Sequence, residues 1–264
     1  MFDLTTARFA FLDIETTGLS PWFGDRICRV AVVVTEGKRI KQTFDLLINP
    51  ERDLSPAAAH VNGLDASQLA DVSERLVSIL KDAVIVCHNS RFGLQFFDSE
   101  YRKLDIQVEF PNLVDTLLLA RQFFDLPSYG LYSLAEAFQA ASNLQGSRAQ
   151  ADALTVKNLF FAMMESLKQF GKPLEEYIGI YNSPAWPEEG VYLPIELSEA
   201  INSGRRLFIK YADKDGGISE RWISDVRVLG LSDYLYLQAF CHTRNAERTF
   251  RLDRILDVAV EVEK

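Results

Sequence analysis

Two acidic residues stand where an apolar strand ends, and their pairing is the clearest chemical feature of this sequence. Residues 9–14 form an apolar run typical of a strand buried on both faces, and Asp13 and Glu15 close it. Because side chains alternate along a strand, both carboxylates leave the same face. Like charges this close repel each other unless a cation lies between them. The pair is therefore a candidate metal site, although charged strand ends without a metal are also common.

The longer run Phe11-Leu-Asp-Ile-Glu-Thr-Thr-Gly-Leu19 resembles the first motif of the DEDD 3'-5' exonucleases, the group of the DNA polymerase III proofreading subunit and RNase T. The resemblance implies a ribonuclease H-like fold and a carboxylate cluster that holds two divalent ions for phosphodiester hydrolysis. Asp13 and Glu15 match its catalytic and metal-binding acids. It also implies that three small residues, Thr16, Thr17 and Gly18, lie beside the terminal nucleotide.

The second motif of that group matches only in part. Many members have His-Asn-x-x-Phe-Asp, and this chain has His88-Asn89-Ser90-Arg91-Phe92-Gly93. His88, Asn89 and Phe92 match and are implied to contact substrate, but Gly93 stands in place of the aspartate. Asp98 lies on another side of the helix expected here, and Glu100 lies about 10 Å further along its axis. Neither acid can therefore replace the missing aspartate without a local break.

The third motif is also incomplete. Asp152 matches the last catalytic acid, but Ser147 stands where one subgroup has histidine and Arg148 where the other has tyrosine. A serine hydroxyl is a very poor base near neutral pH, and an arginine cannot act as one. Asp13, Glu15 and Asp152 thus fill three of the five expected positions. We expect them to hold one Mg²⁺ or Mn²⁺ ion, and we expect the second ion to be weak or lost.

Composition sets broad limits. The chain has 264 residues, 48% hydrophobic and 11% aromatic, enough for one large or two ordinary domains. The net charge of −9 argues against a protein that simply coats nucleic acid, but not against an enzyme that holds a strand end through metal ions. Cys28, Cys87 and Cys241 are too scattered for a disulfide framework. With no signal peptide or membrane span in the pattern, we expect a cytoplasmic protein.

The order of predicted elements is β-β-β-α-β-α-β-α over residues 9–169, which indicates an α/β domain with a mixed sheet. Asp115 follows a short strand and is predicted to cap the next helix. Residues 171–190 carry three prolines and predict a linker that lies against one of the domains. We therefore predict an exonuclease-like domain at 1–172, a linker at 173–190 and a β domain at 191–264.

The β domain begins with a short helix and continues with five short strands. The runs Tyr234–His242 and Arg248–Ile255 are similar to the WYL domain, with Leu235 in place of the signature tryptophan. This resemblance implies a small Sm-like or SH3-like β barrel that senses a ligand, often nucleic acid or a nucleotide. The candidate ligand residues, several of which share a strand face, are Tyr236, Gln238, His242, Arg248, Arg251 and Arg254; a solvated face with Arg–Asp pairs is the alternative.

The sequence thus predicts a protein that binds a single-stranded nucleic acid or its 3' end, DNA or RNA, with cleavage weak or lost. Two alternatives stay open. A working metal-dependent exonuclease could complete its site with another residue or a substrate phosphate. A non-enzymatic regulatory module could act through the WYL domain alone.

Overall fold

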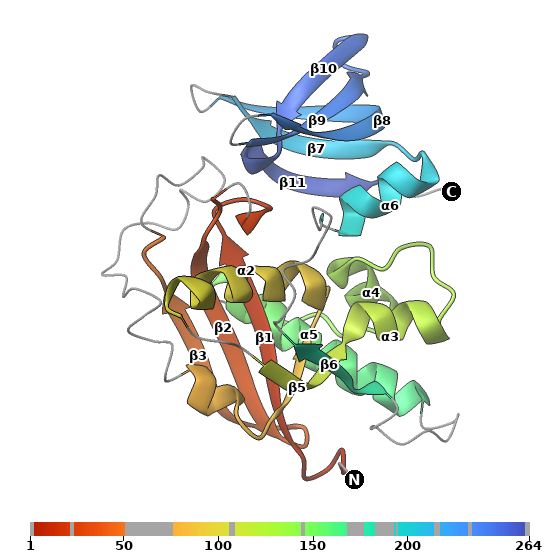
Figure 1. The fold of residues 1–264 in the computed structure, drawn as a ribbon. Helices are drawn as coiled ribbons and strands as arrows, with labels where there is room; N and C mark the ends of the chain where they lie inside the picture. Colours follow the sequence, from red (N-terminus) through yellow and green to blue (C-terminus); the bar gives the residue numbers. More distant parts are fainter. Residues whose placement is uncertain are drawn as a thin grey trace. The chain divides into compact units, whose positions relative to one another are not determined.

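The computed structural model separates into two compact units, each described by itself (Figure 1). The first unit contains the chain up to Glu15, then Ile27–Asn49, and the elements from β4 to β6. The second contains Thr16–Arg26 and every element from α6 onward. The structure describes residues 3–21, 24–50, 76–105, 109–143, 146–167, 177–182, 193, 195–213, 217–231 and 234–261.

A mixed six-stranded sheet forms the middle of the first unit, in the order β3-β2-β1-β4-β5-β6. β1 pairs parallel with β4, and β4 parallel with β5, whereas the pairs β2–β3 and β5–β6 are antiparallel. The mixed sheet predicted from the element order is therefore confirmed. Its strands are β1 (Arg8–Thr16), β2 (Ile27–Glu36), β3 (Arg39–Leu47), β4 (Val84–Cys87), β5 (Glu109–Asp115) and β6 (Gly179–Asn182).

Helices cover both faces of this sheet, and each face has its own hydrophobic core. α2 (Ser90–Lys103) and the helical residues 76–80 pack on one face, whereas α3 (Thr116–Phe123), α4 (Leu131–Ala137) and α5 (Arg148–Leu167) pack on the other. Figure 1 shows α2 crossing the sheet in front and α5 running behind it.

An aromatic cluster fixes α5 against β1. Phe9 and Phe11 of β1 contact Phe160 and Phe161 of α5, with ring centroids 5.2–5.8 Å apart. All four rings are buried, and such pairs add to the free energy gained from burial alone. Because residues alternate along a strand, the face that carries Phe9 and Phe11 also carries Asp13 and Glu15. The cluster thus aligns the acidic end of β1 with the helix that carries Asp152.

Part of the predicted linker is a strand. Gly179–Asn182 forms β6 and pairs antiparallel with β5, with Tyr181 opposite Phe110. These four residues contain no proline, so each can donate to the ladder, and the edge of a sheet accepts a short strand. Within the predicted linker this segment is therefore an edge strand that lies against the first sheet, and the linker boundaries stay a prediction; residues 171–176 and 183–190 lie outside the described part of the chain.

The second unit contains a fully antiparallel five-stranded sheet in the order β10-β9-β8-β7-β11. Asp225 has a φ of 55° at a register shift in β8, a bulge that bends the strand. Among the described strands β10 and β11 are the two edges and do not pair, so these strands form no closed barrel, and the Sm-like or SH3-like barrel stays a prediction. The elements are α6 (Ile195–Ser203), β7 (Leu207–Ala212), β8 (Ile218–Leu231), β9 (Tyr234–Cys241), β10 (Ala246–Arg251), the 3₁₀ turn η5 (Leu252–Arg254) and β11 (Ile255–Val260).

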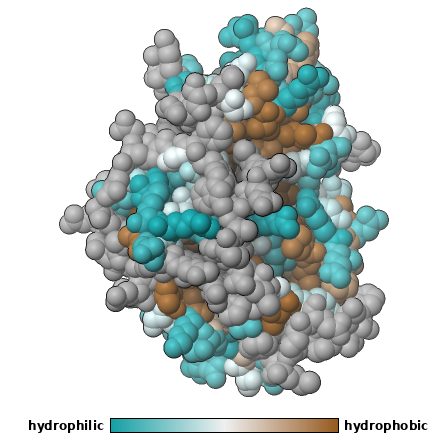
Figure 2. All heavy atoms as spheres, viewed as in Figure 1, coloured by the Kyte–Doolittle hydropathy of each residue, from teal (hydrophilic) through white to brown (hydrophobic). Residues whose placement is uncertain are grey.

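The surface carries hydrophilic and hydrophobic residues side by side (Figure 2). One exposed aromatic residue, Tyr132 at the start of α4, has 54% of its surface accessible and is part of the site described next. In the part of the chain that the structure describes, no helix is both long and apolar enough to cross a membrane.

Candidate active site

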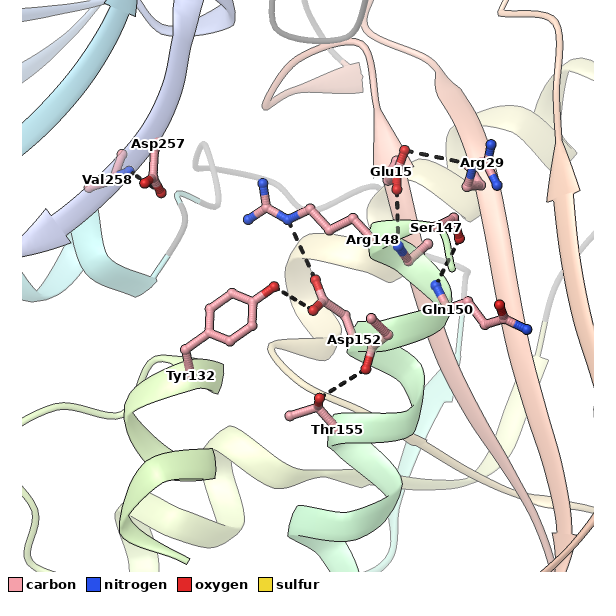
Figure 3. A network of polar contacts seen from close by, with 12 residues as sticks. Glu15, Arg29, Tyr132, Ser147, Arg148, Gln150, Asp152, Thr155, Asp257 and Val258 are labelled. Carbon is pink, nitrogen blue, oxygen red and sulfur yellow. Dashed lines mark hydrogen bonds and ion pairs between the residues drawn. The ribbon is translucent and has the colours of Figure 1, made fainter. Parts of the chain in front are cut away.

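The end of β1 and the starts of α4 and α5 bring together Glu15, Asp152, Tyr132 and Arg148 (Figure 3). Asp13 of β1 is a third acid near them. Burial raises the pKa of the Asp13 carboxyl well above its usual range, and the nearby Asp152 and Glu15 carboxylates raise it further. The Arg148 guanidinium acts in the opposite direction on the same pKa. Asp13, Glu15 and Asp152 therefore form one electrostatic cluster. This agrees with the prediction that Asp13 and Glu15 share a strand face and that Asp152 matches the third acid of the same site.

Asp152 is held on both of its oxygens. The Tyr132 hydroxyl donates to Asp152 Oδ1 at 2.5 Å, and Arg148 Nε lies 3.6 Å from Asp152 Oδ2. Burial raises the pKa of Asp152, while Tyr132 and Arg148 oppose that rise. Arg148 and Asp152 are four residues apart, so they lie on one side of α5. We call this arrangement of Tyr132, Asp152 and Arg148 the Asp152 clamp.

Glu15 is also engaged by the protein. Its Oε1 accepts a hydrogen bond from the Ala149 backbone N–H at 3.0 Å, in the first turn of α5. Its Oε2 lies 3.9 Å from Arg29 Nε, and Arg29 also donates to Asp45 at 2.7 Å. A carboxylate at a helix N-terminus satisfies a backbone donor and complements the helix dipole. Glu15 thus links the end of β1 to the start of α5.

The structure shows what surrounds Gly93 and Ser147, the two positions that depart from the exonuclease motifs. A Cβ atom added at Gly93 meets only Ile14 Cδ1, at 4.0 Å, so this position has room for a side chain although it carries none. Ser147 Oγ accepts from the Gln150 backbone N–H at 3.1 Å, and its carbonyl accepts from Ala151 N–H at 3.0 Å. Ser147 therefore begins α5 as a helix cap.

The predicted metal ligands have to be tested against these contacts. Asp13, Glu15 and Asp152 lie near one another, but no three acids, histidines or cysteines among the described residues adopt an arrangement that could hold a metal ion. One ion would need Asp152 to exchange its Tyr132 and Arg148 partners for the metal. A second ion fits less well, because Gly93 supplies no carboxylate. The ligand role of the three acids therefore stays a prediction.

The loop after β1 is closed by Asp25. Ser20 N–H donates to Asp25 Oδ2 at 3.1 Å, and the buried Thr17 hydroxyl lies 3.4 Å from Oδ1. A side chain at Gly18 would overlap this carboxylate, which explains the glycine there. Thr16 donates from its hydroxyl to the Gly18 carbonyl at 2.5 Å. Thr16, Thr17 and Gly18, expected beside substrate, thus make the loop's internal contacts.

The His88-Asn89 pair follows β4, and Asp115 at the end of β5 holds it. Asn89 is left-handed, with a φ of 58°, and its N–H donates to Asp115 Oδ1 at 3.1 Å. The same carboxylate accepts from the N–H groups of Ser90 and Leu117, which confirms the predicted helix cap.

The remaining motif-two residues are tied to packing. His88 Nδ1 lies 2.9 Å from Thr116 Oγ1, and burial lowers the pKa of His88 to about 4, against the opposing effect of Asp115. Phe92 packs on Phe96 in the core beneath α2, with ring centroids 5.5 Å apart. The expected substrate contacts of His88, Asn89 and Phe92 stay predictions.

The predicted ligand residues of the second unit divide between two faces. Tyr236 pairs with Arg251, and Gln238 with Thr249, so these side chains share a face of the β9–β10 ladder. His242 continues that face, since its ring contacts Phe240 at 5.2 Å and its Nε2 lies 3.0 Å from Ser224 Oγ. Arg248 pairs with the buried Ala239 and lies on the opposite face, whereas Arg254 belongs to the turn η5.

Sequence reasoning missed Tyr132. It belongs to a different helix from Asp152 and no motif includes it, so nothing in the sequence connects the two. The Arg148–Asp152 pair does have a sequence signal, an arginine four residues before an acid on a helix, although Arg148 also stands where one subgroup of the family has tyrosine. The clamp is thus visible only in three dimensions.

The mixed α/β sheet with acids at the end of β1 and the start of α5 is the ribonuclease H-like fold of the exonucleases. The family model RNase_T, described as Exonuclease, matches residues 10–160, and the WYL domain model matches residues 195–260. The chain therefore belongs to the RNase T exonuclease family and carries a WYL domain after its exonuclease domain.

Curated relatives match the first domain. The chain is 35% identical over 171 residues to "DNA polymerase III PolC-type" of Caldanaerobacter subterraneus, covering 62% of this chain and 12% of that protein. It is 32% identical over 173 residues to "3'-5' exonuclease DinG" of Bacillus subtilis, covering 63% and 18%. This chain thus spans less than a fifth of either relative.

Among solved structures, the nuclease domain of 3'hExo, a DEDDh family member bound to rAMP, aligns with a TM-score of 0.50 at 16% identity. The alignment covers 69% of this chain and 99% of that domain, and supports the fold.

Proposed function

We propose that this protein binds the 3' end of a single-stranded nucleic acid in its exonuclease domain and cleaves it slowly or not at all. One observation carries the proposal. Asp13, Glu15 and Asp152 are clustered, whereas Gly93 adds no carboxylate and Ser147 is used as a helix cap. Membership of an exonuclease family supports nucleic acid as the ligand. A missing general base alone lowers the rate by about 10²–10⁴.

Members of this family generally use divalent metal ions. In this chain Asp13, Glu15 and Asp152 would hold one Mg²⁺ or Mn²⁺ once Asp152 exchanges its Tyr132 and Arg148 partners for the ion, and the ion would neutralise charge on a bound phosphate. The protein groups have their own tasks. Tyr132 and Arg148 hold Asp152 while no ion is bound, and the Ala149 N–H orients Glu15.

The test is digestion of a 5'-labelled single strand, DNA and RNA separately, with Mg²⁺ or Mn²⁺ in excess. The proposal expects stable binding with slow or no loss of 3' nucleotides, and any digestion should disappear in Asp13→Ala and in Asp152→Ala. Rapid digestion that both variants abolish would establish a working exonuclease instead. Activity that survives in both variants would show a contaminating nuclease.

We propose further that the WYL domain binds a phosphate-bearing ligand, a nucleotide or an oligonucleotide, on the face of β9 and β10 that carries Tyr236, Gln238 and Arg251. Their register places an arginine fork beside a phenol and an amide, donors that suit a phosphate. Isothermal titration of the whole protein with nucleotides tests this, with Arg251→Ala expected to lose binding and Arg39→Ala as the control. Unchanged binding in Arg251→Ala would refute this site.

A further inference from the structure

The contacts around Asp152 do not suit the second divalent ion of a two-metal site. Among the described residues, position 93 contributes no carboxylate, and both Asp152 oxygens already have protein partners. One of those partners is a permanent cation, since an arginine side chain stays protonated in proteins. We propose that Arg148 takes the place of the second metal ion and binds a backbone phosphate at the nucleic-acid end. This inference rests on the proposed function.

The burial of the Arg148–Asp152 pair suits such a role. The Arg148 side chain is 63% exposed, whereas the Asp152 side chain is only 11% exposed. The buried Asp152 carboxylate thus holds Arg148 on its protein side, while the Arg148 guanidinium faces solvent. Figure 3 shows the ends of the guanidinium extending past Asp152, away from its carboxylate. A guanidinium has five N–H donors in a planar fork, so the contact of Arg148 with Asp152 leaves donors for a phosphate.

Charge arithmetic points the same way. A complete motif set has four acids with a formal charge of −4, which two divalent ions balance. Here three acids, Asp13, Glu15 and Asp152, carry −3 when ionised, and Arg148 adds +1, so the sum is −3 + 1 = −2. Arg29 is not counted, because its closer partner is Asp45 at 2.7 Å. The strong repulsion that three uncompensated carboxylates would exert on a phosphate is therefore reduced without any metal.

Tyr132 is the positioning residue of this arrangement. Its hydroxyl holds Asp152 Oδ1 at 2.5 Å, which leaves Oδ2 directed at Arg148. Tyr132 therefore acts on Arg148 through Asp152, which contacts both residues. Loss of the hydroxyl in Tyr132→Phe should loosen the arginine without removing its charge, and should weaken phosphate binding only a few-fold.

The experiment measures binding of a labelled single-stranded oligonucleotide by fluorescence anisotropy, in EDTA and in Mg²⁺, over a series of salt concentrations. It compares the whole wild-type protein with Arg148→Ala, Arg148→Lys and Tyr132→Phe. Arg39→Ala is the matched control, because Arg39 is an exposed arginine at the start of β3. It pairs with Glu36 at the hairpin end of β2, whereas Arg29, the β2 residue near Glu15, lies at the opposite end of that strand. Thermal unfolding of each variant verifies that it is folded.

We expect the wild-type protein to bind the oligonucleotide in EDTA. Arg148→Ala should weaken that binding about 10- to 100-fold, the effect of losing a charge-assisted contact. The slope of log K against log salt should fall by about 0.7, the value for one phosphate contact on a single strand. Arg148→Lys should recover most of the slope, and Arg39→Ala should behave as wild type. A nucleoside 5'-monophosphate should compete with the strand in wild type more strongly than its nucleoside, and this difference should disappear in Arg148→Ala.

Two results would separate the failure of this inference from that of the proposed function. Binding that requires Mg²⁺, or that is unchanged in Arg148→Ala, leaves the proposed function in place and overturns the role of Arg148. Absence of binding in both EDTA and Mg²⁺ overturns the proposed function and this inference with it.

Discussion

Restoring the two motif residues should convert this site into a faster nuclease. The change is the double variant Gly93→Asp with Ser147→His, which supplies the missing carboxylate and the missing base. The structure has room for the first replacement, because a Cβ atom at position 93 meets only Ile14 Cδ1 at 4.0 Å. Position 93 lies in the first turns of α2, where an acid is favoured by the helix dipole.

The cost in stability is modest. Replacing glycine in a helix gains a few tenths of a kcal/mol, roughly, and loss of the Ser147 cap to Gln150 N–H costs about 1 kcal/mol. The protein should therefore remain folded at 25 °C. The general base alone should raise the rate of the chemical step by about 10²–10⁴.

The assay is single-turnover digestion of a 5'-labelled strand with enzyme in excess and Mg²⁺ saturating. Each single variant and the triple variant that adds Asp13→Asn are the controls, and the last should abolish the gain. A wild type that already digests as fast as the double variant would refute the reasoning that Gly93 and Ser147 limit catalysis. No gain in a folded double variant would refute it equally.

Three further predictions concern local structure. Asp115→Ala should lower the free energy of unfolding by about 3 kcal/mol in urea denaturation, because its carboxylate accepts from Asn89, Ser90 and Leu117, whereas exposed Asp125→Ala should change it little. The free energy of unfolding should fall by up to about 3 kcal/mol between pH 6.5 and 4, because burial lowers the folded-state pKa of His88 to about 4 and only the unfolded state gains a proton there over this range. His88→Gln should lack this part of the fall, and identical pH profiles of wild type and His88→Gln would contradict the prediction. Asp25→Ala should cost about 1–2 kcal/mol by opening the loop after β1, and unchanged stability would show that its bond to Ser20 N–H contributes nothing.

The sequence predicted most of what positions the site. Alternation along residues 9–15 placed Asp13 and Glu15 on one face, and the position of Asp152 at the start of a long helix placed it near them. The structure agrees because Phe9 and Phe11 pack on Phe160 and Phe161, so the face of β1 and the start of α5 must meet. Such patterns are local, and local patterns are what periodicity reports.

What the sequence did not predict depends on contacts between distant segments. Tyr132 reaches Asp152 across 20 residues, and Arg29 reaches Glu15 across the β1–β2 pair, with no motif to connect either pair. β6 was not predicted because prolines flank it on both sides, and an edge strand of four residues is too short for a clear pattern. The pattern of five short strands and the family resemblance both predicted a β barrel; the described strands form one antiparallel sheet whose edges do not pair, so the barrel stays a prediction.

The central claim is that this domain retains a nucleic-acid end more effectively than it cuts it. The most direct measurement follows a doubly labelled single strand in one tube, with anisotropy for binding and loss of the 3' label for cleavage, at saturating Mg²⁺. The account predicts a bound strand whose 3' label is released at least about 100-fold more slowly than by the Gly93→Asp, Ser147→His variant. Equal release by the two proteins, or a strand that never binds, would contradict it.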